Sequence, residues 1–170
     1  MPVFSDSERV SRPQYMTETR RPTYTFIRHG ESLFNKNRVS GRDPGLTDDG
    51  HLCASELSGN YDYALISCMR RARETFVYAP NLSANAIEYS SLCREIISNG
   101  ESKPNLMDGE ENIEEDDDAF EFRMQLLREF LRHKAEKYST ILVVCHYHVI
   151  KALTYGRAKN CQAFSIDKLD

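Results

Sequence analysis

The feature that most constrains the fold is the apolar run Thr140–Cys145, with the sequence TILVVC. A strand with one face in water would alternate between apolar and polar residues, but this run has no polar face after its first residue. Such a strand is typical of a parallel sheet covered by helices on both faces. Thr23–Ile27 (TYTFI) and Tyr63–Ser67 (YALIS) are two further short runs with the residue types of buried strands.

Segments with helical character separate these runs. Thr47 is a suitable N-cap because acids follow it in what would be the first helical turn. The predicted helices are Leu46–Leu57, Arg70–Tyr78, Ala119–Lys137 and His148–Gly156, the last closed by Gly156, and a third extended stretch covers Asn85–Cys93. This alternation predicts an α/β fold, a three-layer sandwich with a mainly parallel central sheet flanked by helices.

The length and the charge pattern indicate one domain with a tail. At 170 residues, the chain suits a flexible N-terminal tail at residues 1–21 and a single domain at residues 22–170. Residues Asp108–Asp118 form an acidic block, which we expect to be a solvated loop whose last acids favour the start of the next helix.

The composition argues against several classes of partner. The net charge is −4 with both signs mixed, so no broad basic surface indicates a nucleic acid or an anionic membrane as partner. No run of about 18 apolar residues indicates a membrane span, and the first residues do not resemble a secretory signal. The five cysteines are odd in number and scattered, which fits free thiols in a reducing cytoplasm better than a disulfide framework.

Three strand ends carry residues suited to chemistry. Arg28 and His29 follow the first strand, Ser67–Arg71 follows the second, and His146 follows the apolar run. Ligands of such folds bind outside the carboxyl ends of the strands, so we expect these segments to meet in one crevice. Guanidinium groups fit phosphate oxygens, and a neutral imidazole can attack phosphorus. The pattern therefore favours a phosphate site over a purely structural role for His29.

The sequence CHYH at residues 145–148 allows other interpretations. Cys145 beside His146 could be a thiol nucleophile, but neighbours on a strand point to opposite faces, so we expect Cys145 in the core. No distant pair of ligands completes a metal site around this sequence. His148 could replace His146 in the crevice, although its place makes it the better candidate for starting the following helix.

The chain also resembles a known family. RHGES at residues 28–32 with Asn35, RVSG at 38–41, Asp43 and LTDDG at 46–50 are similar to the signature of the histidine phosphatase superfamily, in its phosphoglycerate mutase-like branch. The resemblance continues, in order, through SCMRRARET at 67–75, LCREI at 92–96 and VVCH at 143–146. It covers nearly the whole chain, from about Thr23 to Ile166.

The resemblance implies a role for each matching residue. His29 is the expected nucleophile that becomes phosphorylated, Glu95 the general acid, and His146 a catalytic residue that also binds the phosphoryl group. The other residues expected to bind the phosphate of the substrate are Arg28, Asn35 and Arg71, with Arg70 on the surface. The resemblance implies no cofactor and no metal.

Three departures from the family pattern concern the substrate. Tyr147 stands where the family usually has glycine, so a bulky side chain either narrows the pocket or points away from it. The stretch between Asn35 and Arg38 is shorter than in typical members, which puts the role of Arg38 in doubt. The sequence after Glu95 lacks the usual aromatic-Glu-Gly element, so substrate recognition there does not carry over.

The distance between Glu95 and His146 favours a phosphatase over a mutase. Mutases that resemble this family carry a long insertion between these two positions, whereas here they are about fifty residues apart. A mutase must keep water away from its intermediate, and a short cover leaves the pocket open. We therefore expect a metal-independent phosphatase acting on a phosphorylated small molecule or a phosphoprotein. The alternatives are an impaired, phosphatase-like binding protein, a mutase-type phosphotransferase, and an interaction module that docks a basic protein on its acidic block.

Overall fold

The computed structural model describes residues 21–37, 43–96 and 115–169. Strands and helices alternate along most of this chain. The elements are β1 (Thr23–Arg28), α1 (Leu33–Asn37), α2 (Asp48–Ser55), β2 (Ser58–Ser67), α3 (Arg70–Val77), β3 (Asn81–Ser90), the 3₁₀ turn η1 (Ser91–Cys93), α4 (Asp117–Ala135), β4 (Thr140–Cys145), α5 (Tyr147–Thr154) and β5 (Ala163–Ile166). The predicted α/β class is thereby confirmed.

The five strands form one sheet in the order β3-β2-β4-β1-β5. β4 pairs in parallel with β1 on one side and with β2 on the other, and β3 extends the parallel sheet beyond β2. Only β5 among these strands runs antiparallel, against β1. The carboxyl ends of β1, β2, β3 and β4 therefore share one edge of the sheet.

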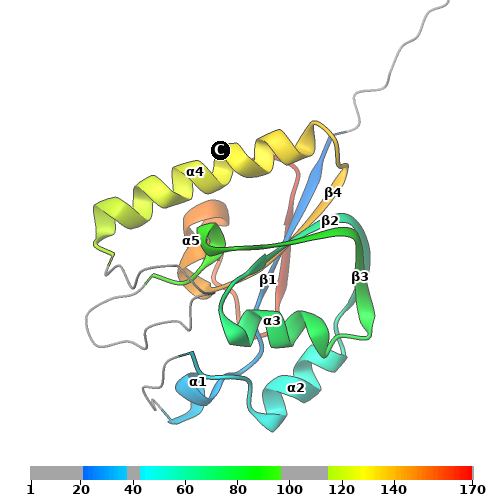
Figure 1. Ribbon diagram of the computed structural model, residues 1–170, viewed down its shortest axis with the longest axis vertical. Helices are drawn as coiled ribbons and strands as arrows, with labels where there is room; N and C mark the ends of the chain where they lie inside the picture. Colours follow the sequence, from blue (N-terminus) through cyan, green and yellow to red (C-terminus); the bar gives the residue numbers. More distant parts are fainter. Residues whose placement is uncertain (1–20, 38–42, 97–114, 170) are drawn as a thin grey trace, which may run out of the picture.

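Helices cover both faces of the sheet, as the apolar run of β4 requires. Ile141, Val143 and Cys145 pack with apolar residues of α4 and α5, while Leu142 and Val144 pack with residues of α3. Figure 1 shows α4 and α5 on the opposite side of the sheet from α2 and α3. The result is the expected three-layer sandwich with a mainly parallel sheet.

Local sequence signals explain where two helices begin. Thr47 is the N-cap of α2, and its hydroxyl accepts a hydrogen bond from the backbone N–H of Gly50 at 3.0 Å. Asp116 caps α4 in the same way, through the N–H of Ala119 at 2.8 Å. The acids that follow each cap lie at the positive end of the helix dipole.

The end of α5 differs from the prediction. The left-handed conformation lies at Tyr155, with φ 57°, and not at Gly156. The structure needs a glycine at position 156 to avoid close contacts. A Cβ there would lie 2.9 Å from the ring of Phe164 and 3.0 Å from the hydroxyl of Thr154. The glycine makes room for the strand β5, whereas the turn is made by the tyrosine before it.

One acidic residue also differs from the prediction. Of the expected solvated loop Asp108–Asp118, Glu115 is buried, because Arg94 and Arg123 both pair with it. Residues 108–114 lie outside the described residues, as does the predicted tail except for Arg21.

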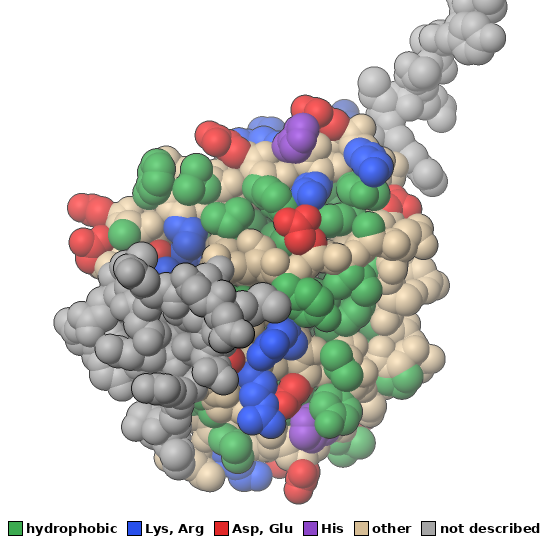
Figure 2. All heavy atoms as spheres, in the orientation of Figure 1, with side chains coloured by type: hydrophobic (Ala, Val, Ile, Leu, Met, Phe, Trp, Pro, Cys, Tyr) green, Lys and Arg blue, Asp and Glu red, His purple; other side chains and the backbone are tan. Residues whose placement is uncertain are grey.

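The described surface is mixed in character. The face seen in Figure 2 carries hydrophobic, acidic and basic side chains in small groups, with a short row of basic side chains below its centre. None of the helices in the described ranges combines the length and the apolar character that spanning a bilayer needs.

Candidate active site

His29 lies directly after β1, at the shared edge of the parallel strands. Its backbone N–H donates to the carbonyl of Cys145, the last residue of the neighbouring strand β4, at 3.0 Å. Its side chain is inside the protein, with 2 % of the residue exposed. The continued pairing of β1 with β4 therefore fixes the backbone that carries His29.

Two contacts determine the protonation of the His29 ring. Nδ1 lies 2.7 Å from the carbonyl oxygen of Gly30, which can only accept, so Nδ1 carries the proton. Nε2 accepts a hydrogen bond from Nε of Arg71 at 3.2 Å. Burial and the positive charge of Arg71 lower the pKa of His29 well below its usual value. The ring is therefore neutral, with a lone pair on Nε2.

The loop after His29 is fixed by close backbone packing. A Cβ on Gly30 would lie 2.7 Å from the carbonyl oxygen of Gly50 in α2, so only glycine fits this position. The N–H of Gly30 donates to the hydroxyl of Thr75, which itself donates to the carbonyl of Arg71. Thr75 thus connects the His29 loop to the helix that carries Arg71.

His146 follows β4 and lies next to His29, with ring centroids 5.0 Å apart. It is fully buried, and its Nε2 shares a hydrogen bond of 2.8 Å with the hydroxyl of Ser67 at the end of β2. Its Nδ1 is buried and has no hydrogen-bond partner among the described residues. Burial and the charge of Arg71 lower the pKa of His146, so this ring is neutral as well.

Arg28 is held by the segment that follows α5. Its Nη1 donates to the carbonyl of Ala158 at 2.9 Å, and its guanidinium lies over the ring of Tyr147, 5.4 Å from the centroid. Burial lowers the pKa of Arg28, while the nearby Glu95 opposes this shift. Arg28 nevertheless stays charged, because an arginine pKa lies far above neutral pH.

Asn35 in α1 has one end of its amide engaged by the protein. Its Oδ1 accepts from the N–H of Ser32 at 3.2 Å and from the hydroxyl of Ser32 at 3.0 Å. Nδ2 is then the atom of this amide that can donate to an anion. Asn160 supports the same region, since its amide donates to the carbonyl of His29 at 2.8 Å.

Glu95 follows η1, next to the carboxyl end of β3. Its backbone N–H lies 3.4 Å from the sulfur of Met69, and its Oε1 accepts from the N–H of Ile96 at 3.1 Å. The same oxygen lies 3.3 Å from Nδ1 of His148, in the first turn of α5. The carboxyl group is largely buried, with 11 % of the side chain exposed.

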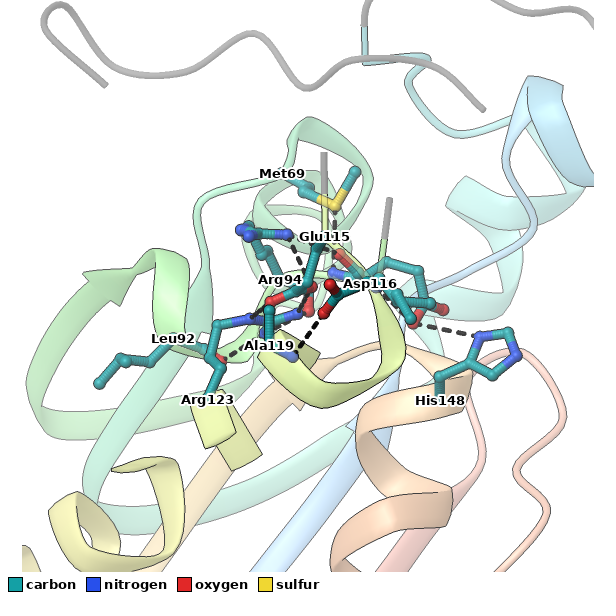
Figure 3. A network of polar contacts seen from close by, with 10 residues as sticks. Met69, Leu92, Arg94, Glu115, Asp116, Ala119, Arg123 and His148 are labelled. Atoms are coloured by element: carbon teal, nitrogen blue, oxygen red, sulfur yellow. Dashed lines mark hydrogen bonds and ion pairs between the residues drawn. The ribbon is translucent and has the colours of Figure 1, made fainter. Parts of the chain in front are cut away.

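A buried network of charges holds the segment that carries Glu95 (Figure 3). Glu115 accepts from Nε of Arg123 at 2.7 Å and from Nη1 of Arg94 at 3.2 Å. Arg123, from α4, also donates to the carbonyls of Leu92 and Arg94, at 2.8 and 2.9 Å. These bonds fix the backbone on the N-terminal side of Glu95 to α4.

The groups described above line a cavity of about 300 Å³ at the edge of the sheet. Its walls are Arg28, His29, Phe34, Asn35, Arg71, Glu95, Tyr147 and His148. Five of the six predicted site residues are in this wall, and His146 lies behind it against His29. Two arginines, a neutral imidazole and a carboxyl group in one cavity can bind a phosphoryl group and move a proton next to it.

Several residues of the site were not predicted from sequence. Ser67, Thr75 and Asn160 support the histidines and their loop. Ser67 and Thr75 were within a matching motif but had been given no role, and Asn160 was in no predicted element or motif. Tyr147 lines the cavity and does not point away from it. α5 begins one residue before the expected start, at Tyr147, so His148 lies in its first turn. His148 also lines the cavity, a place for which the sequence favoured His146.

Two alternative roles for the CHYH sequence find no support in the geometry. Cys145 is fully buried in the core with its pKa raised well above the usual value, so it is a poor nucleophile. No cluster of three His, Cys, Asp or Glu side chains in the described ranges could hold a metal ion. Arg38–Gly41 and the stretch from residue 97 to 114 lie outside the described residues.

Comparison with known proteins finds similar solved structures but no match in sequence. Neither protein-family models nor curated protein sequences match the chain. Among solved structures, the product of the open reading frame Rv3214 from Mycobacterium tuberculosis matches with a TM-score of 0.64 and 17 % identity, over 86 % of this chain and 91 % of that one.

Two further solved structures carry names that refer to phosphate chemistry. An Escherichia coli protein provisionally assigned as an alpha-ribazole-5'-P phosphatase has a TM-score of 0.65 and 21 % identity, over 85 % of this chain and 89 % of that one. A phosphoglycerate mutase from Thermus thermophilus has a TM-score of 0.62 and 22 % identity, over 85 % and 92 %. The resemblance predicted from sequence is thus confirmed at the level of the fold.

Proposed function

We propose that this chain, which has the fold of the histidine phosphatases, is a metal-independent phosphatase that hydrolyses phosphomonoesters through a phosphohistidine on His29. One observation carries the proposal. His29 is neutral, its proton is held on Nδ1 by Gly30, and its Nε2 faces Arg71 in a cavity that also contains Arg28 and Glu95. A nucleophile, two cations for the phosphate and a carboxyl group therefore lie together in one cavity of about 300 Å³.

Binding of the phosphoryl group would rely on Arg28, Arg71 and Asn35. The two guanidinium groups offer several N–H donors to its oxygens, and Asn35 adds Nδ2. Arg71 would release Nε2 of His29 and turn its donors to the phosphate. The charge of the transition state lies on the equatorial oxygens, so these donors stabilise it as well as the bound substrate.

The first half of the reaction would transfer the phosphoryl group to His29. The lone pair on Nε2 forms the N–P bond as the P–O bond to the leaving alcohol breaks. Protonated Glu95 gives its proton to that oxygen, so a neutral alcohol leaves and Glu95 becomes a carboxylate. Gly30 accepts from Nδ1 throughout, which stabilises the positive charge that the ring acquires.

The second half would return the enzyme to its starting state. Water attacks phosphorus, the carboxylate of Glu95 takes a proton from it, and the N–P bond breaks to give inorganic phosphate. When Ser67 donates to Nε2 of His146, the proton of that neutral ring lies on Nδ1. The Nδ1 proton is then available to donate to the phosphoryl group, which is the role proposed for His146.

The substrate class follows from what the cavity contains. Its described wall supplies groups for one phosphoryl group, which suits a phosphorylated small molecule or a phosphoprotein side chain. Two of the similar structures, the provisionally assigned alpha-ribazole-5'-P phosphatase from Escherichia coli and the phosphoglycerate mutase from Thermus thermophilus, are named after phosphorylated small molecules. We favour hydrolysis over transfer because of the short distance in sequence between Glu95 and His146.

The first experiment is hydrolysis of p-nitrophenyl phosphate in the presence of EDTA, with wild type and His29→Ala compared. We expect turnover by the wild type alone, and an acid-labile phosphoenzyme that His29→Ala does not form. Equal turnover by both proteins would exclude His29 as the nucleophile. Binding of inorganic phosphate without turnover of any phosphomonoester in a substrate screen would favour the binding protein, and phosphoryl transfer to a second monoester would favour the mutase.

A further inference from the structure

Two of the five cysteines lie together near the surface. Cys53 in α2 and Cys161, which comes shortly before β5, are only partly buried, and they line one cavity of about 430 Å³. The Sγ atom of Cys53 lies 3.9 Å from the carbonyl oxygen of Asn160, the residue directly before Cys161. The other three cysteines are buried: Cys68, Cys93 and Cys145. A small reagent can therefore reach the Cys53–Cys161 pair through the cavity, whereas burial protects the other three thiols.

The two thiols contact each other. Burial raises the pKa of Cys161, and a hydrogen bond with the Cys53 thiol raises it further. Sulfur atoms in such contact need only a small movement to reach the S–S bond length of about 2.05 Å. The thiolate is the reactive form of cysteine, so the raised pKa makes Cys161 slow to react. Cys53 is therefore the thiol expected to attack an oxidant first, with Cys161 as its partner in the resulting bond.

The segment that carries Cys161 supports two residues of the candidate active site. The backbone N–H of Cys161 donates to the carbonyl of Arg28 at 2.9 Å. The carbonyl of Ala158 accepts from the Arg28 guanidinium at 2.9 Å. The amide of Asn160 donates to the carbonyl of His29 at 2.8 Å. A covalent bond that pulls Cys161 toward α2 would therefore displace the groups that hold Arg28 and His29.

We propose that Cys53 and Cys161 form a reversible disulfide on exposure to a low-molecular-weight disulfide, and that this bond slows the enzyme. The thiolate of Cys53 attacks one sulfur of the small disulfide, whose S–S bond breaks, and the half that leaves takes up the proton lost by Cys53. Cys161 then loses its proton and attacks the sulfur of Cys53, which releases the second half as a thiol. Two protein thiols are thus oxidised, and one small disulfide is reduced to two thiols. The effect on the rate, but not the formation of the bond, rests on the proposed function.

The bond itself can be measured without any assay of activity. The reduced full-length protein is incubated with oxidised glutathione, the remaining thiols are alkylated, and a tryptic digest is analysed by mass spectrometry without reduction. We expect a link between the peptides 43–70 and 160–168, the second of which contains only Cys161. Because the first contains both Cys53 and Cys68, the variant Cys53→Ser is the control and should abolish the link. A link that persists in Cys53→Ser would overturn the proposal, as would wild type that carries glutathione on single cysteines and no link.

The consequence for catalysis is measured on the same samples with p-nitrophenyl phosphate. We expect kcat/KM of wild type to fall about tenfold on oxidation and to recover with dithiothreitol, because a misplacement of about 1 Å can cost as much as a hundredfold in rate. Cys53→Ser and Cys161→Ser should each stay within about twofold of reduced wild type and should not respond to oxidised glutathione.

Two results would contradict the effect on the rate. One is an unchanged rate in wild type that is fully linked, and the other is an equal loss of rate in oxidised Cys53→Ser. Failure of the proposed function gives a different result. The link would then form as expected, but reduced wild type would hydrolyse no phosphomonoester, so the disulfide would have no such activity to regulate.

Discussion

Nε of Arg71 lies 3.2 Å from Nε2 of His29, although 42 residues separate the two in the chain. The contact connects the first turn of α3 to the end of β1. Nε2 of His29 is the atom that we propose as the nucleophile. In the contact it accepts from a guanidinium N–H that is equally suited to donate to a phosphoryl oxygen. The same cation also lowers the pKa of both buried histidines.

Replacing Arg71 with lysine should reduce kcat/KM for p-nitrophenyl phosphate about a hundredfold. Lysine keeps the charge but loses the planar fork, and the loss of one such donor costs about 3 kcal/mol in the transition state. Arg70→Lys is the control, because the adjacent Arg70 is 59 % exposed and pairs with Glu74. Its rate should stay within about twofold of wild type; an equal loss in both variants would contradict the assignment of Arg71.

Replacing Tyr147 with alanine should widen the range of substrates. The ring lines the cavity and packs against the Arg28 guanidinium, so its removal opens the wall beside the phosphate. We expect the ratio of kcat/KM for naphthyl phosphate to that for a small alkyl phosphate to rise about tenfold, the size of effect that one pocket side chain exerts. Tyr147→Phe keeps the ring and should keep the wild-type ratio. An unchanged ratio in the alanine variant would show that the ring does not limit access.

Replacing Glu115 with glutamine should destabilise the fold and slow the reaction. Arg94 and Arg123 would both lose their buried counter-charge, which costs about 3 kcal/mol of unfolding free energy, measured by urea denaturation. The segment before Glu95 would lose its attachment to α4, so kcat should fall under conditions where the variant is still folded. Glu121→Gln is the control, since Glu121 is exposed and 3.8 Å from its partner Arg128. It should change the unfolding free energy by less than about 1 kcal/mol.

The two neutral histidines should make the fold less stable in mild acid. Burial lowers the pKa of both His29 and His146 below the value of about 6.5 in the unfolded chain. The unfolded chain therefore takes up protons first as the pH falls below about 6.5. The neutral rings therefore make their full contribution to the free energy of unfolding above that pH. This contribution decreases as the pH falls from about 6.5 toward the pKa of each histidine in the folded protein.

The measurement is urea denaturation at pH 7 and pH 5.5. We expect the decrease in unfolding free energy between these values to be about 2 kcal/mol smaller in His29→Asn/His146→Asn than in wild type, about 1 kcal/mol for each histidine. His133→Asn removes an exposed histidine and should leave the decrease unchanged. The same decrease in all three proteins would show that the buried rings do not control this pH dependence.

The convergence of the site could be predicted because it depends on a general property of parallel sheets. Arg28 ends a strand, His29, Arg71 and His146 each come after one, and the carboxyl ends of parallel strands meet at one edge. The N-cap at Thr47 could also be predicted, because it depends only on residues within one turn of the helix. Signals of this kind are local in sequence, or follow from the direction of the strands.

Contacts that need a particular tertiary partner could not be predicted in this way. Glu115 belongs to an acidic block, and its burial depends on Arg94 and Arg123 reaching it from two other elements. His148 was correctly placed in a helix, but the face that it presents depends on where Glu95 lies. The strand β5 is short and only partly buried, and its pairing with β1 gives it a structure that its own four residues do not signal.

The position of β4 has a consequence for the order in which the protein is made. β1 and β2 are not neighbours in the sheet and are joined only through β4, which begins at Thr140. A ribosome must therefore synthesise His29, Arg71 and Glu95 long before the strand that brings them together. Before Thr140 is made, β2 and β3 can pair with each other, but β1 has no partner in the sheet, because both of its neighbours, β4 and β5, come later in the chain. Insertion of β4 then joins β1 to β2 and brings the residues of the site together.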